Sequence, residues 1–227
     1  MENMNEKHVE NNMTEKCSTN KLYAVLSIDP GEVNLGWTLI VNNKSFKTNK
    51  EVDVEDLSLK FNVFNFKCLL DKLSKKYNSK VIARCKILKD FINQFTDKFI
   101  IEYFIVEQQV GTTNTKCMEI MSILCSLIMN YIDDPEDIIV FKPQNKFTKL
   151  GIEYDSRNKA HKRLSINMCR ATLMEITNND LIELFDKHPK QDDVADSFNQ
   201  AILWLTENNK IYLSLSDIRS FIKPFLK

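Results

Sequence analysis

Two short apolar runs, each ending in a carboxylate, constrain the fold of this chain more than any other feature. Residues 22–28 read Leu-Tyr-Ala-Val-Leu-Ser-Ile and lead into Asp29-Pro-Gly, and residues 100–106 read Ile-Ile-Glu-Tyr-Phe-Ile-Val and lead into Glu107. Short apolar runs bounded by turn residues are typical of buried strands. The carboxyl end of a strand holds a side chain rigidly at the rim of a sheet, where loops leave room for substrate. The sequence therefore predicts a sheet with Asp29 and Glu107 at its rim.

The remaining periodicity predicts an α/β fold. Residues 36–41 are expected to form a second strand, and the turn at residues 42–44 predicts a third strand around 45–52. A short strand is expected at 137–141, and helical spacing indicates helices at 56–77, 81–98 and 115–131. Together these elements predict a mixed five-stranded sheet flanked by helices.

The length and composition favour one folded domain. The 227 residues are 43% hydrophobic, which is enough for a single core at residues 21–227. Residues 1–20 are polar and are expected to form a flexible N-terminal tail. No apolar run reaches the roughly 20 residues of a membrane span, and none of the six cysteines forms a CxxC pair. We expect an intracellular protein in a reducing compartment, without membrane contact.

A third group of acids opens another expected helix. Asp192, Asp193 and Asp196 follow Pro189, and an apolar helix continues through residue 205. Acids at a helix start also act as helix caps. Taken alone, Asp29 is better explained as the start of the Pro-Gly turn, and Glu107 as an exposed strand end. Capping explains less well why Asp193 and Asp196 lie three residues apart on one face.

Carboxylates in a chain with only three histidines favour hard cations. Mg²⁺, or Mn²⁺ in its place, is therefore the expected cofactor, and two such ions about 4 Å apart support phosphodiester hydrolysis. The candidate ligands, which are also the candidate catalytic residues, are Asp29, Glu107 and the acidic cluster Asp192, Asp193 and Asp196.

A basic segment precedes the last acidic group. Residues 142–170 hold eight basic and two acidic residues, although the whole chain has 31 of each. A run of charge is often only a solvated helix face. Next to candidate nuclease residues it favours contacts with phosphates. The candidate nucleic-acid-binding residues are Lys142, Lys146, Lys149, Arg157, Lys159, Lys162 and Arg163.

Three motifs carry a family resemblance. The segment Ser-Ile-Asp-Pro-Gly-Glu-Val-Asn-Leu-Gly-Trp at 27–37 resembles the first strand motif of RuvC-type Holliday junction resolvases. Residues 105–109, Ile-Val-Glu-Gln-Gln, resemble the second motif, and Asp193-Val-Ala-Asp196 resembles the last. The resemblance spans residues 22–206, and the segment from Lys142 to Phe147 is most similar to the poxvirus branch. Ser197 departs from the family pattern, which usually has alanine at this position.

The resemblance implies an RNase H-like fold and a homodimer that makes symmetric nicks in branched four-way DNA during viral recombination or concatemer resolution. It implies that Asp29 bridges two metals and that Glu107, Asp193 and Asp196 complete the catalytic and metal-binding set, with Asp192 as an alternative to Asp193. It also implies that the host cytoplasm is the site of action if the chain is viral. Another RNase H-like nuclease, a strand-transfer enzyme and a non-catalytic DNA-binding module remain alternatives. An actin-like phosphohydrolase is disfavoured, because the chain has only four glycines and no second glycine-rich phosphate loop.

Overall fold

The fold is built on one five-stranded mixed sheet with the strand order β3-β2-β1-β4-β5. A computed structural model describes residues 21–109, 115–153, 160–176 and 179–225. The strands are β1 (Leu22–Pro30), β2 (Leu35–Asn42), β3 (Ser58–Phe64), β4 (Phe99–Glu107) and β5 (Ile138–Phe141). The first three form an antiparallel meander, whereas β4 and β5 run parallel to β1. The expected mixed five-stranded α/β fold is confirmed.

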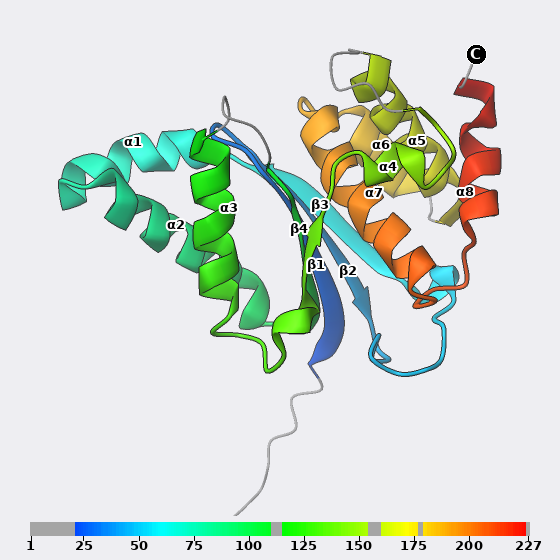
Figure 1. Cartoon of the computed structure of the whole chain (residues 1–227), viewed down its shortest axis with the longest axis horizontal. Helices are drawn as coiled ribbons and strands as arrows, with labels where there is room; N and C mark the ends of the chain where they lie inside the picture. Colours follow the sequence, from blue (N-terminus) through cyan, green and yellow to red (C-terminus); the bar gives the residue numbers. More distant parts are fainter. Residues whose placement is uncertain (1–20, 110–114, 154–159, 177–178, 226–227) are drawn as a thin grey trace, which may run out of the picture.

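Helices cover both faces of the sheet (Figure 1). One face carries α1 (Phe66–Tyr77), α2 (Lys80–Thr96) and α3 (Thr115–Ile128). The other carries α4 (Asn145–Thr148), α5 (Ala160–Ile176), α6 (Asn179–Asp186), α7 (Gln191–Glu207) and α8 (Leu215–Ile222). Short 3₁₀ turns lie at Val54–Asp56, Pro135–Asp137 and Lys223–Phe225.

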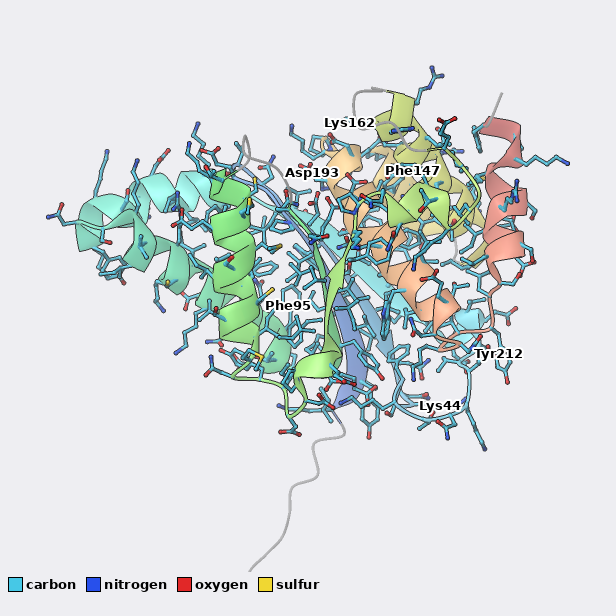
Figure 2. All side chains as sticks on the ribbon, viewed as in Figure 1. Lys44, Phe95, Phe147, Lys162, Asp193 and Tyr212 are labelled. Atoms are coloured by element: carbon cyan, nitrogen blue, oxygen red, sulfur yellow. The ribbon has the colours of Figure 1, made fainter. Side chains whose placement is uncertain are left out.

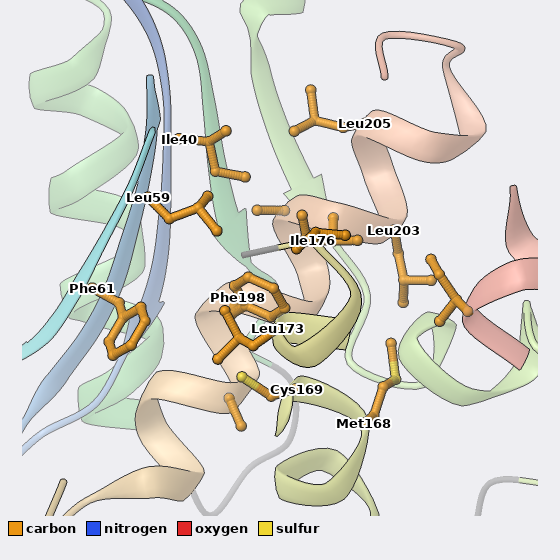
Figure 3. Packing of buried hydrophobic residues seen from close by; sticks show 14 of the residues in the cluster. Ile40, Leu59, Phe61, Met168, Cys169, Leu173, Ile176, Phe198, Leu203 and Leu205 are labelled. Atoms are coloured by element: carbon orange, nitrogen blue, oxygen red, sulfur yellow. The ribbon is translucent and has the colours of Figure 1, made fainter. Parts of the chain in front are cut away.

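The central strand β1 divides its apolar side chains between the two faces. Ala24, Leu26 and Ile28 join the core under α1–α3, and Val25 joins the core under α5–α8. This division follows from the alternation of side chains along a strand. In the second core, Phe198 of α7 packs with Leu173 of α5 (Figure 3). Because both faces are buried, β1 reads as a continuous apolar run.

The expectations for residues 45–77 are wrong in two places. Residues 45–52 do not form the third strand: only an isolated bridge joins Val52 to Ile211. The third strand is β3, inside the segment expected to be helical, and the helix begins only at Phe66. Leu59 and Phe61 are buried while Ser58 and Lys60 are exposed, an alternation of period two that marks a strand.

No helix within the described ranges is long and apolar enough to cross a membrane. The five cysteines in the same ranges are free thiols. The expected tail at 1–20 lies outside the described residues.

Candidate active site at the sheet edge

Parallel pairing places Asp29 and Glu107 side by side. Ile28 pairs with Val106, so the residues that follow them leave the sheet at the same edge on neighbouring strands. Glu107 is only 8% exposed, whereas Asp29 is partly exposed at the rim. Two carboxylates that are far apart in sequence are thus held next to each other by backbone hydrogen bonds.

Lys146 enters the same edge from β5. Glu107 pairs with Phe141 at the end of β5, and the chain then turns into α4. This turn brings Lys146, which is 3% exposed, between two carboxylates: its Nζ hydrogen-bonds to Glu107 and lies 2.8 Å from Asp196 Oδ1. The adjacent Phe147 stacks on His161 of α5 with 4.9 Å between ring centroids, which fixes α4 against α5.

The first turn of α7 brings the remaining acids to this edge. Gly36 of β2 pairs with Asp29 on one side and contacts the backbone of Asp193 on the other. A Cβ at Gly36 would lie 2.1 Å from the carbonyl oxygen of Asp193, so only glycine allows this approach. Asn34 lies 3.5 Å from Asp193 Oδ2. One turn later on the same helix, Asp196 faces Lys146.

Burial and mutual repulsion raise the affinity of the carboxylates for protons. Burial, followed by repulsion from Glu107 and Asp196, raises the pKa of Asp29 well above its ordinary value. Burial also raises the pKa of Glu107, although Lys146 opposes this change. For Lys146, burial lowers the pKa, but attraction to Asp196, Glu107 and Asp29 outweighs burial, so the ammonium stays protonated. The buried Glu107 and the partly exposed Asp29 and Asp196 thus share one buried cation, Lys146.

Asp192 and Asp193 have different surroundings. Asp192 forms an ion pair of 2.8 Å with the exposed Lys162. Burial raises the pKa of Asp192, but Lys162 and hydrogen bonds from backbone amides together bring it below its ordinary value. Asp193 has a raised pKa, caused first by burial and then by repulsion from Asp192. Asp193 also contributes to the raised pKa of Asp29. Asp193 therefore interacts with the carboxylates at the sheet edge, whereas Asp192 is paired with Lys162.

A buried polar chain orients Asp196. Ser165 Oγ of α5 donates a hydrogen bond of 2.8 Å to Asp196 Oδ1. Asn199 Nδ2, one turn further along α7, donates to the Ser165 carbonyl and to Ser165 Oγ, each at 2.9 Å. These contacts hold Ser165 in place and direct its hydroxyl to Asp196.

Polar contacts also fix α7 against the sheet. Ser197 Oγ lies 2.9 Å from Thr38 Oγ1 of β2. Gln200 Nε2 donates to Ser27 Oγ at 2.8 Å and to the Ile28 carbonyl at 2.9 Å, directly behind Asp29. The serine that departs from the family pattern at position 197 thus has a structural role.

The donor set suits a hard divalent cation. Asp29, Glu107, Asp193 and Asp196 offer only carboxylate oxygens, the ligands that Mg²⁺ and Mn²⁺ prefer. Among the described residues, no group of three acids, histidines or cysteines is arranged to hold a metal as it stands. A physical reason is that the Lys146 ammonium lies between Glu107 and Asp196, as a cation inside the acidic group. Buried carboxylates need such a countercharge.

The candidate nucleic-acid-binding residues other than Lys146 lie in different environments. Lys142 and Arg163 are exposed, and Lys162 lies with Asp193 at one end of the molecule (Figure 2). Lys149 forms an ion pair with Glu207 and lies over the Phe141 ring. Arg157 and Lys159 lie outside the described residues. Of the seven, Lys146 alone among those described enters the carboxylate group.

Sequence reasoning missed the residues that support the acids, namely Asn34, Ser165, Asn199 and Gln200. For Asn199 and Gln200, the sequence does contain a signal. Asn199 and Gln200 are polar residues within the apolar stretch of α7, and both are fully buried. Polar side chains on a buried helix face need hydrogen-bond partners, which marks them for a role.

Comparisons with known proteins agree with this architecture. The sequence matches the family described as Poxvirus A22 protein over residues 23–208. None of the curated proteins compared with the chain matches it. The fold is similar to the yeast mitochondrial Holliday junction resolvase Ydc2, with a TM-score of 0.54 and 18% identity over 89% of this chain and 86% of that one.

Two further solved structures have lower similarity. Thermus thermophilus RuvC gives a TM-score of 0.45 and 12% identity over 83% of this chain and 97% of that one. The T. thermophilus RuvC in complex with a Holliday junction substrate gives a TM-score of 0.43 and 11% identity, over 85% of this chain and 99% of that one. The similarity to the yeast protein shows a common fold.

Proposed function

The chain belongs to the poxvirus A22 protein family, and from this premise we propose that it is a structure-selective endodeoxyribonuclease that resolves four-way DNA junctions. The observation that carries the proposal is the convergence of Asp29, Glu107 and Asp196 at one sheet edge, with Lys146 among them. In viral DNA metabolism, such an activity would separate recombined or concatenated genomes.

Asp29, Glu107, Asp193 and Asp196 would hold two Mg²⁺ ions, with Mn²⁺ as a substitute, and Asp29 would be the ligand that the two ions share. When bound, such ions supply Lewis acidity to the attacking water and to the leaving 3′ oxygen. The contrast between Asp192 and Asp193 favours Asp193 as the fourth ligand, since Asp192 is paired with Lys162.

The chain's own residues prepare the site in three ways. Lys146 offsets the repulsion between carboxylates before substrate arrives and adds positive charge where a phosphate would approach. Ser165 restrains one oxygen of Asp196. Gln200 ties the end of β1 to α7, so that Asp29 and Asp196 keep a fixed relative position. Preorganised charges of this kind need little rearrangement during the reaction.

Two symmetric cuts require two sites related by a two-fold axis, so a homodimer is the proposed active form. Lys142, Lys162 and Arg163 are exposed candidates for contact with the DNA backbone near each site.

The test uses three substrates of matched sequence: a four-way junction, a linear duplex and an RNA–DNA hybrid, each with and without Mg²⁺. The expected result is paired nicks at symmetric positions, on the junction and only with metal. Cleavage of the hybrid alone would instead indicate an RNase H-type activity, and metal-independent or absent cutting of all three would overturn the nuclease proposal.

A further inference from the structure

We propose that α1 is a second DNA-binding surface, which holds the backbone of one duplex arm at a distance from the cut. This inference rests on the proposed junction-resolving function and extends it to a part of the chain outside the basic segment 142–170. The surface is defined as Lys67, Lys72, Lys75 and Lys76.

The four lysines share one side of α1. Within residues 66–80 there are five lysines and a single acid, Asp71. With 3.6 residues per turn, the four positions fall opposite the face that carries the buried Phe66 and Leu70. All four lysines are exposed. The helix is therefore amphipathic, with an outer face of four lysines and one exposed acid, Asp71, between Lys67 and Lys75.

Only two acids are found near this positive charge among the described residues: Asp71 on α1, and Glu32, whose charge interacts with Lys67. Within the part of the chain that the structure describes, none of the four lysines is in an ion pair, whereas Lys86 on α2 pairs with Asp90 at 2.5 Å. Lys76 lies over the neighbouring Tyr77 ring, a contact that leaves its charge in place. The chain as a whole has no net charge, so α1 carries a local excess of positive charge. Such an excess favours binding of a polyanion such as DNA.

The fold attaches α1 to the active-site edge. Phe64 at the end of β3 pairs with Leu35, which in turn pairs with Pro30, next to Asp29. Phe64 and Pro30 are thus two strand spacings apart, each of about 4.8 Å. The Lys67 amide then donates to the Val33 carbonyl at 3.0 Å, in the loop that follows Asp29.

The electrostatics place Lys67 near the same loop. Glu32, in that loop, has a lowered pKa, chiefly because of a hydrogen bond from Lys116 and to a smaller extent because of Lys67. From this anchor α1 projects away from the sheet, on the face opposite to the one that carries α7 (Figure 1).

The dimensions match a stretch of duplex. A helix of 12 residues is about 18 Å long, and phosphates along one DNA strand are about 3.4 Å apart along the axis. The lysine face, from Lys67 to Lys76, is about 13.5 Å long and thus spans about four phosphates. Such contacts read no base sequence, which agrees with an enzyme that recognises the shape of a junction.

The experiment compares the full-length protein with the variant Lys72→Gln/Lys75→Gln/Lys76→Gln. The control Lys44→Gln/Lys50→Gln/Lys98→Gln removes three exposed lysines at the opposite end of the sheet, where Lys44 is seen in Figure 2. Affinity for a four-way junction is measured in EDTA over a range of salt concentrations. Cutting is then measured in Mg²⁺ with saturating protein, and hydroxyl-radical footprints record which phosphates are covered.

The α1 variant should bind about 10-fold or more weakly at low salt, with a salt slope shallower by about 2 to 3, because each lost phosphate contact removes about 0.9. Its footprint should shorten along one arm, while the cutting rate of the saturated complex stays within about 2-fold of wild type. A slope and footprint equal to those of the control variant would overturn the inference alone. A wild-type protein that does not prefer the junction over duplex would overturn the proposed function, and this inference with it.

Discussion

At the scale of the residue, Asp29 combines a place at the sheet edge with an unfavourable electrostatic environment. Its folded-state pKa is raised by burial and then by Glu107 and Asp196. The folded protein therefore holds this proton more tightly than the unfolded chain does. As pH rises from the ordinary value of 3.8 through the raised pKa, stability falls, and it stays lower at neutral pH.

Asp29→Asn should therefore stabilise the metal-free protein at pH 7. The amide has no charge to bury, so the gain should be about 1.4 kcal/mol for each unit by which the folded pKa is raised. Denaturant unfolding in EDTA at pH values from 3 to 8 measures the difference between variant and wild type. The gain should vanish below pH 3.8, where the wild-type carboxyl is protonated in both states. A variant that is less stable at pH 7, or a difference that does not change with pH, would contradict the assignment.

Lys146→Met should have the opposite effect on stability. Removing the ammonium leaves Glu107 and Asp196 without their buried partner, which costs about 3 to 5 kcal/mol for a broken buried pair. If Mg²⁺ binds the same carboxylates, it should restore much of this loss. The measurement is the free energy of unfolding with EDTA and with excess Mg²⁺, with Lys142→Met, exposed nearby, as control. An equal loss in both conditions would mean that metal does not bind there.

The position of Lys146 illustrates what the sequence does not reveal at this scale. The basic segment indicates phosphate contacts for all its lysines, because charge runs usually lie on the surface. Burial of this one depends on the pairing of Glu107 with Phe141 and on the turn into α4. Such three-dimensional contacts are not encoded in local spacing.

At the scale of the element, the contact between β2 and α7 determines where the last acids lie. Gly36→Ala would place a Cβ 2.1 Å from the Asp193 carbonyl oxygen, so the first turn of α7 must move away. We expect a loss of about 1 to 3 kcal/mol in stability, typical of overpacking, and a larger loss of cutting than of junction binding. Ser58→Ala, exposed on β3, serves as control. Unchanged cutting by Gly36→Ala would show that this approach does not position Asp193.

Elements were predictable where the apolar pattern fits a single period. The strands before Asp29 and Glu107 and the helix α7 agree with expectation to within a few residues. In contrast, Leu57, Phe61 and Phe64 are spaced four and three apart, which fits a helix as well as a strand. The alternation of Leu59 and Phe61 with exposed neighbours belongs to β3, and its pairing with β2 decides between the two.

At the scale of the whole molecule, the sheet topology assembles the site. Because β1, β4 and β5 are parallel, their carboxyl ends bring Asp29, Glu107 and the turn before Lys146 to one edge. The motif order along the chain made a common site at a sheet edge predictable. The supporting contacts of Ser165 and Gln200 were not, since they depend on how α5 and α7 pack against each other and the sheet.

We propose that this edge of the sheet cuts junction DNA through its carboxylates, and a single substitution separates cutting from binding. Wild type and Asp29→Asn are compared for binding and cutting of the same four-way junction in Mg²⁺. We expect the variant to bind as tightly as wild type to within about 3-fold. Cutting should fall by a factor of about 1,000 or more, because the ligand that we propose the two metals share is lost. A variant that still makes paired nicks at near wild-type rate would contradict this proposal.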